Sequence, residues 1–134
     1  MKNLLLSITA AAALYSCTAV PAGNAKLGKA QLPLLNTQWV LADAVKGKAP
    51  TLIIENGIIS GSGLCNRYFG NLTLDATVGN FNVSQIGSTK MACENNSTET
   101  SYFKMLDEAD KYIVSGNTLE LYKGNLLLMK FNRQ

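Results

Sequence analysis

Apolar and polar residues alternate along much of the chain beyond residue 36, which is the pattern of β-strands with one buried face. The alternation is clear in residues 72–76. Turn signals divide the pattern into short segments, and Asn56-Gly57 is a strong hairpin signal. The apolar positions of residues 81–86 are too few to decide which face of that strand is buried. The strands expected from these signals are 39–41, 51–55, 58–62, 67–76, 81–86, 112–114, 118–122 and 126–131.

One segment departs from this alternation. In residues 99–111 the apolar side chains recur at helical spacing, and no glycine or proline interrupts them. Asn96 stands three residues before Glu99, which resembles a capping box with Asn96 as the cap. Many short strands, close turns and one helix predict a mainly β fold. We expect a small antiparallel, strongly curved, β-barrel-like domain with a single α-helix over an open end or edge.

The N-terminal residues have the features of an export signal rather than of a folded element. Lys2 precedes an apolar run that ends near Leu14 and is too short to span a bilayer as a stable helix. The run stops just before Cys17, which resembles a bacterial lipoprotein signal, although Tyr15 departs from the usual small residue. An ordinary secretory signal with an incidental cysteine is the alternative interpretation.

This N-terminal pattern predicts three regions: a lipoprotein signal peptide at 1–16, a lipidated tether at 17–35 and a folded domain at 36–134. The protein is then exported and anchored in a membrane through lipid on Cys17, facing the periplasm or the cell surface. Thr18 is not acidic, which is consistent with the outer membrane in a Gram-negative host.

Charge gives no indication of a nucleic-acid partner. The 134-residue chain carries a formal net charge of +3 at pH 7. Loss of residues 1–16, which include Lys2, leaves 118 residues with 11 basic and 9 acidic side chains. Such a small excess forms no electrostatic footprint for nucleic acid.

Three cysteines occur in the chain, and lipidation of Cys17 leaves Cys65 and Cys93. An exported protein meets an oxidising compartment, which favours a disulfide between these two. Two buried free thiols are the competing interpretation.

The glycine-rich segment 59–71 looks at first like a catalytic loop, but the sequence lacks the groups that such chemistry needs. The chain has no histidine, which excludes Ser-His-Asp and Cys-His catalysis and most zinc and haem sites. Ser62 lacks the glycine spacing of a nucleophile elbow, and no Gly-Lys-Ser/Thr phosphate motif is present. We therefore expect no catalytic residue, cofactor or metal ligand.

Several short motifs nevertheless occur in a specific order over residues 36–131, nearly the whole expected domain. Together they resemble the META/HslJ family of small exported bacterial domains, many of which are lipoproteins. The family motif residues are Trp39, Ser60, Gly61, Cys65, Asn66, Gly70, Thr89, Met91 and Cys93. The resemblance implies a compact, curved, barrel-like domain with one helix. It implies no catalytic residues, and it associates the protein with envelope or heat stress.

Three functions are compatible with these features. The first is a non-enzymatic envelope lipoprotein that binds a protein partner in stress tolerance, with Arg67 as a candidate contact. The second is a barrel that binds a lipid or a small apolar ligand, or a pilot-like role in secretion. The third, with the least support, is a hydrolase that uses serine or carboxylates. A barrel interior filled with side chains would argue against the second.

Overall fold

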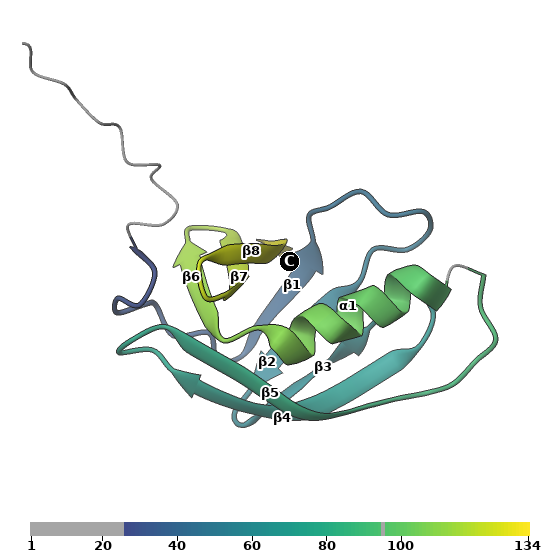
Figure 1. Cartoon of the computed structure of the whole chain (residues 1–134), viewed down its shortest axis with the longest axis horizontal. Helices are drawn as coiled ribbons and strands as arrows, with labels where there is room; N and C mark the ends of the chain where they lie inside the picture. Colours follow the sequence, from purple (N-terminus) through teal and green to yellow (C-terminus); the bar gives the residue numbers. More distant parts are fainter. Residues whose placement is uncertain (1–25, 95) are drawn as a thin grey trace, which may run out of the picture.

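The computed structural model describes residues 26–94 and 96–134, which form eight antiparallel strands and one helix (Figure 1). The elements are β1 (Thr37–Leu41), β2 (Thr51–Glu55), β3 (Ile58–Ser62), β4 (Arg67–Asp75), β5 (Asn80–Ser88), α1 (Asn96–Glu108), β6 (Lys111–Ser115), β7 (Thr118–Lys123) and β8 (Leu126–Arg133). The strands follow chain order around a closed barrel. The expected mainly β fold with a single helix is therefore confirmed.

The barrel closes where the last strand meets the first. β8 pairs with β1 from Trp39↔Arg133 to Leu41↔Phe131. The weakest junction lies between β5 and β6, which pair at one register position, Asn80↔Lys111. Helix α1 links these two strands and crosses the open side of the sheet (Figure 1). It thus covers the facing edges of β5 and β6, where the two strands share only one pair of residues.

Side chains fill the interior of the described barrel. The largest side chains with under 2% exposure are Trp39, Tyr102, Tyr112, Phe81, Phe131, Leu34, Leu52, Ile54, Ile59, Leu106, Leu119 and Leu121. They come from the strands, from α1 and from the segment before β1, and they belong to one core cluster. The hydrophobic effect that holds this barrel together therefore comes from one continuous core.

The helix occupies a different range from the one expected. It begins at Asn96 and ends at Glu108, three residues earlier at each end than the predicted segment 99–111. Asp110 ends the helical region by pairing with strands instead: its N–H donates to Tyr122 O and its carbonyl accepts from Phe81 N–H. These strand bonds are non-local, so the helical periodicity of the sequence does not reveal them.

The buried face of β5 becomes clear in the structure. Phe81 and Val83 point into the core, and the alternation then breaks at Gln85, which has a φ of 53°. The register of β4 and β5 shifts between Phe69 and Asn71. A β-bulge therefore lies here, beside Gly70.

Folded structure extends to the N-terminal side of the boundary expected at residue 36. Leu34 is only 1% exposed and belongs to the core. Gln31 donates its N–H to Ala76 O, and its side-chain Oε1 accepts from Val114 N–H. Part of the segment assigned to the tether therefore packs across one end of the barrel. The expected signal peptide and Cys17 lie outside the described residues.

Candidate functional site

The loop between β3 and β4 wraps around a buried carboxylate. Glu99, in the first turn of α1, is 4% exposed, and its Oε2 accepts the backbone N–H groups of Cys65 (2.8 Å) and Asn66 (2.9 Å). A Cβ atom on Gly63 would lie 2.5 Å from the same oxygen. The loop can approach the carboxylate this closely only because position 63 is glycine.

Asn66 connects this carboxylate to the segment that follows β5. Its Nδ2 donates to Glu99 Oε1 at 2.6 Å. Its Oδ1 accepts the Thr89 hydroxyl at 3.0 Å and the Met91 N–H at 2.8 Å. Asn66 therefore joins three segments that are distant in sequence.

A disulfide between Cys65 and Cys93 ties the same segments covalently, with their Cα atoms 6.3 Å apart. That separation lies in the usual range for a bridge. The expected disulfide is therefore present, and the interpretation as two free thiols is wrong for this structure.

The expected capping box is also wrong. Glu99 does not reach back to the start of its own helix, because both of its oxygens are engaged by the loop 63–66. Burial raises the pKa of the Glu99 carboxyl, but the hydrogen bonds from Asn66 and Cys65 outweigh it, and the pKa lies below its usual value. The charged form of Glu99 is therefore part of the folded structure.

A pair of tyrosines closes the barrel beside this loop. The hydroxyls of Tyr68 and Tyr102 lie 2.9 Å apart, and each also reaches the Thr51 carbonyl oxygen. Burial raises the pKa of both hydroxyls well above the ordinary value. They stay neutral and serve as hydrogen-bonding groups of the core. A side chain on Gly61 would overlap the Thr51 carbonyl oxygen, which explains the glycine in the motif.

The remaining motif residues divide into a buried group and an exposed one. Trp39 is 1% exposed, donates to Thr37 Oγ1 at 2.7 Å, and lies under the Arg133 guanidinium at 5.6 Å. Ser60 lies opposite Phe69 in the pairing of β3 with β4. Met91 is 56% exposed. Thr89 is also exposed, so most of the motif builds the fold, and Thr89 and Met91 are its exposed members.

Exposed cations and apolar side chains gather on the surface next to the loop between β3 and β4. We call this the Arg67–Met91 surface (Lys48, Arg67, Phe69, Lys90 and Met91). A hollow of about 470 Å³ is lined by Lys48, Arg67 and Phe69, with Thr51, Ser60 and Ser62 among its other walls. A second hollow, of about 400 Å³, is lined by Lys90 and Met91 together with Asn66, Thr89 and Glu99. The Arg67 N–H donates to Thr89 Oγ1 and the Thr89 N–H donates to Arg67 O, and these two bonds place the two hollows side by side.

The Arg67 side chain has no structural partner among the described residues. The ion pairs in residues 26–94 and 96–134 are Lys123–Glu108 and Lys130–Glu120. The bonds of Arg67 are made by its backbone N–H and carbonyl. Beside it, Phe69 is 64% exposed, with its ring over Gly87. Among the cations of this surface, the sequence singled out Arg67 but not Lys48. It did not single out the exposed ring of Phe69 either. Their gathering depends on strand register.

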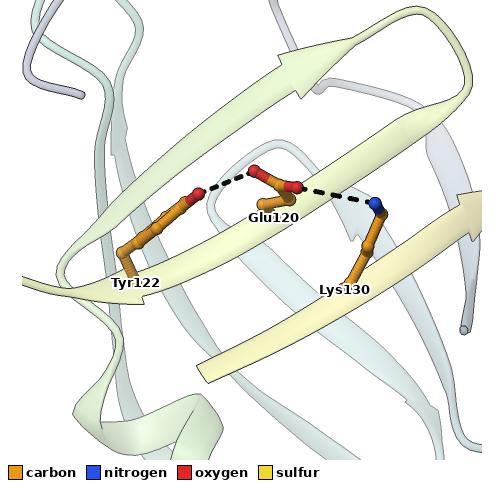
Figure 2. Close-up of polar contacts among 3 residues, drawn as sticks. All are labelled: Glu120, Tyr122 and Lys130. Atoms are coloured by element: carbon orange, nitrogen blue, oxygen red, sulfur yellow. Dashed lines mark hydrogen bonds and ion pairs between the residues drawn. The ribbon is translucent and has the colours of Figure 1, made fainter. Parts of the chain in front are cut away.

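A second polar cluster lies on β7 and β8 (Figure 2). The Tyr122 hydroxyl donates to Glu120 Oε2 at 2.7 Å, and Lys130 Nζ lies 3.7 Å from Glu120 Oε1. Burial and the neighbouring carboxylate raise the pKa of Tyr122 to about 12. Glu120 and Lys130 face each other across the two strands. The cluster therefore supports strand pairing and offers no activated nucleophile.

In the part of the chain that the structure describes, no three His, Cys, Asp or Glu side chains gather in a group that could hold a metal ion. No helix there is long and apolar enough to cross a membrane.

A family model described as the META domain matches residues 32–134. Among solved structures, the chain is similar to a protein from Burkholderia xenovorans with 26% identity and a TM-score of 0.63, covering 75% of this chain and 83% of that one. A crystal structure of a DUF4847 family protein from Bacteroides vulgatus has the same fold at 15% identity and a TM-score of 0.56, covering 74% and 93% of the two chains. No curated protein matches the chain.

Proposed function

The chain belongs to the META domain family, and on that premise we propose that it is a non-enzymatic lipoprotein of the cell envelope. It binds a partner protein through the Arg67–Met91 surface and in this way contributes to tolerance of envelope or heat stress. The lipid on Cys17 anchors it to the membrane.

One observation carries the proposal. Arg67 extends from the surface without an ion pair in the described chain, next to an aromatic ring that is 64% exposed. Arginine and aromatic side chains are enriched among the residues that dominate binding energy at protein interfaces. The loop below them is held by Glu99, Asn66 and the disulfide, so the surface is rigid and little entropy is lost on binding.

The barrel interior argues against the apolar-ligand alternative. A lipocalin-like protein needs an internal cavity, whereas the core positions of this barrel are occupied by large side chains such as Trp39, Phe81 and Phe131. A pilot-like role in secretion is itself a form of partner binding and would use the same Arg67–Met91 surface.

The chemistry of the site favours binding over catalysis. The full sequence contains no histidine. The buried polar groups Glu99, Tyr68 and Tyr102 all have hydrogen-bond partners within the fold. They therefore act as structural supports for the surface.

Genetic complementation tests the proposal. A deletion strain should survive heat or envelope stress less well than its parent, and the wild-type chain should restore survival. Arg67→Glu should fail to restore it, because charge reversal disrupts an interface while leaving the core untouched. Leu126→Ser is the matched control, since Leu126 is as exposed as Phe69 and lies on another part of the barrel.

Two results would contradict the proposal. Equal survival of the deletion strain and its parent would remove the stress role. Full rescue by Arg67→Glu, at the same protein level as wild type, would show that the Arg67–Met91 surface does not bind the partner.

A further inference from the structure

One end of the barrel gathers several exposed aliphatic side chains close to the point where the N-terminal segment enters the fold. We call it the N-terminal end (residues 26–36 with the turns 56–57, 76–79 and 115–117). Leu32 is 61% exposed, Leu35 49% and Val78 40%. In Figure 1 it lies on the left, whereas α1 begins on the right.

Contacts of the surrounding segment with the barrel keep these side chains facing solvent. The carbonyl of Leu32 accepts the Tyr112 hydroxyl at 3.2 Å, and the neighbouring Leu34 is buried in the core. Gly79 packs so closely on this segment that a Cβ there would lie 3.0 Å from Gln31 Cγ. The segment is therefore fixed, and Leu32 and Leu35 cannot turn inward.

The length of chain between the anchor and this end restricts what can face it. Lys26 lies nine residues after Cys17, and a fully extended chain spans at most about 3.3–3.6 Å per residue, or roughly 30 Å over this length. A domain of this size has a radius of gyration of about 13 Å. The tether is thus no longer than the domain is wide, and the end from which it departs stays nearest to the bilayer.

From this geometry we propose that the N-terminal end of the barrel lies on the lipid bilayer, with Leu32, Leu35 and Val78 in the membrane interface. The inference rests on the proposed lipid anchor at Cys17. The exposed cations Lys26, Lys29 and Arg133, whose N–H donates to Asn117 O, lie at this end with the exposed anions Glu55 and Asp75. The charge excess is small, so the contact is mainly apolar and needs no anionic lipid. The Arg67–Met91 surface, on the strand ends remote from these turns, then projects away from the membrane.

Fluorescence quenching on the acylated, full-length protein in phosphatidylcholine vesicles tests this orientation. Leu32→Cys offers a thiol for an environment-sensitive dye, because Cys65 and Cys93 are bridged and Cys17 carries lipid. Leu126→Cys is the matched control, since the exposed fractions are 61% at Leu32 and 64% at Leu126. The dye at position 32 should be quenched several-fold more strongly by lipid-borne doxyl groups than the dye at position 126.

A second variant separates apolar contact from mere proximity. With the dye at Ala30→Cys, the changes Leu32→Asp and Leu35→Asp should reduce lipid quenching several-fold, and both positions are exposed, so the fold should persist. Equal quenching at 32 and 126, or an unchanged signal in the Asp variant, would overturn the inference.

The anchor is checked separately by mass spectrometry of the N-terminal peptide. Cys17 without acyl chains contradicts the lipoprotein proposal and removes the basis of the inference with it. Acylated protein whose dye at position 32 remains in water overturns the membrane contact alone.

Discussion

At the scale of single residues, Glu99 joins several residues of the family motif into one hydrogen-bonded unit. Its carboxylate accepts three hydrogen bonds from Cys65 and Asn66. Asn66 in turn accepts hydrogen bonds from Thr89 and Met91. A charge with 4% exposure is stable in the fold only because these donors replace water. The loop that carries the Arg67–Met91 surface therefore depends on a single ionised group.

The sequence contained a signal for this role that the capping interpretation missed. Glu99 lies three residues before Tyr102 and seven before Leu106, so it shares the buried face of the helix with them. A carboxylate on an apolar helix face requires a polar partner, and that partner is 33 residues away in sequence. Local spacing can identify the requirement but cannot identify the loop that meets it.

Replacement of the carboxylate tests this arrangement. Glu99→Gln should lower the free energy of unfolding by about 2–3 kcal/mol, because a charged acceptor is lost and an amide donor then faces the Asn66 amide. The double variant Glu99→Gln/Asn66→Asp restores a donor and an acceptor at this contact and should recover part of the loss. Chemical denaturation of the four proteins in a double-mutant cycle measures the coupling. Additive losses would show that the two side chains do not interact.

The lowered pKa of Glu99 also predicts a pH dependence. A carboxyl whose pKa is lower in the folded than in the unfolded state stabilises the fold above its unfolded pKa, near 4.5. This stability is lost as the pH falls through the folded pKa. The wild-type melting temperature should therefore fall below about pH 4.5, and Glu99→Gln should show a smaller fall over the same range. Parallel melting curves for the two proteins would contradict the assignment.

At the scale of elements, the strands were predictable and their closure was not. Alternation and turn signals are local, and each of the eight expected strands appears in the structure. The pairing of β1 with β8 and the single register pair of β5 with β6 join residues far apart in the chain. Register and closure depend on those non-local contacts, and so does the gathering of Lys48, Arg67 and Phe69 on one face.

The disulfide joins two connecting segments rather than two strands, and its loss should affect the whole domain. Cys65 and Cys93 are 28 residues apart in sequence, and a crosslink of that length stabilises a fold by roughly 3.5 kcal/mol in the chain-entropy model. Reduction should then lower the melting temperature by about 15 °C. Calorimetry with and without reductant measures the shift, and Cys65→Ser/Cys93→Ser is the control that reductant should not affect. An unchanged melting temperature after verified reduction would refute a stabilising bridge.

At the scale of the whole molecule, the barrel separates two surfaces of different character. The N-terminal end carries exposed aliphatic side chains beside the departing tether, and the Arg67–Met91 surface lies near the opposite strand ends. A filled core between them makes the domain a rigid spacer. In the proposed arrangement, the anchored end holds the protein on the membrane while the other end presents cations and apolar side chains to a partner.

Site-specific photo-crosslinking in living cells tests the partner-binding claim most directly. A photoreactive phenylalanine analogue in place of Phe69 should yield a discrete protein adduct, because this side chain is 64% exposed within the proposed interface. The adduct should weaken several-fold when Arg67→Glu is added, and the same analogue in place of Leu126 should yield none. No adduct from position 69, or equal adducts from positions 69 and 126, would contradict the account.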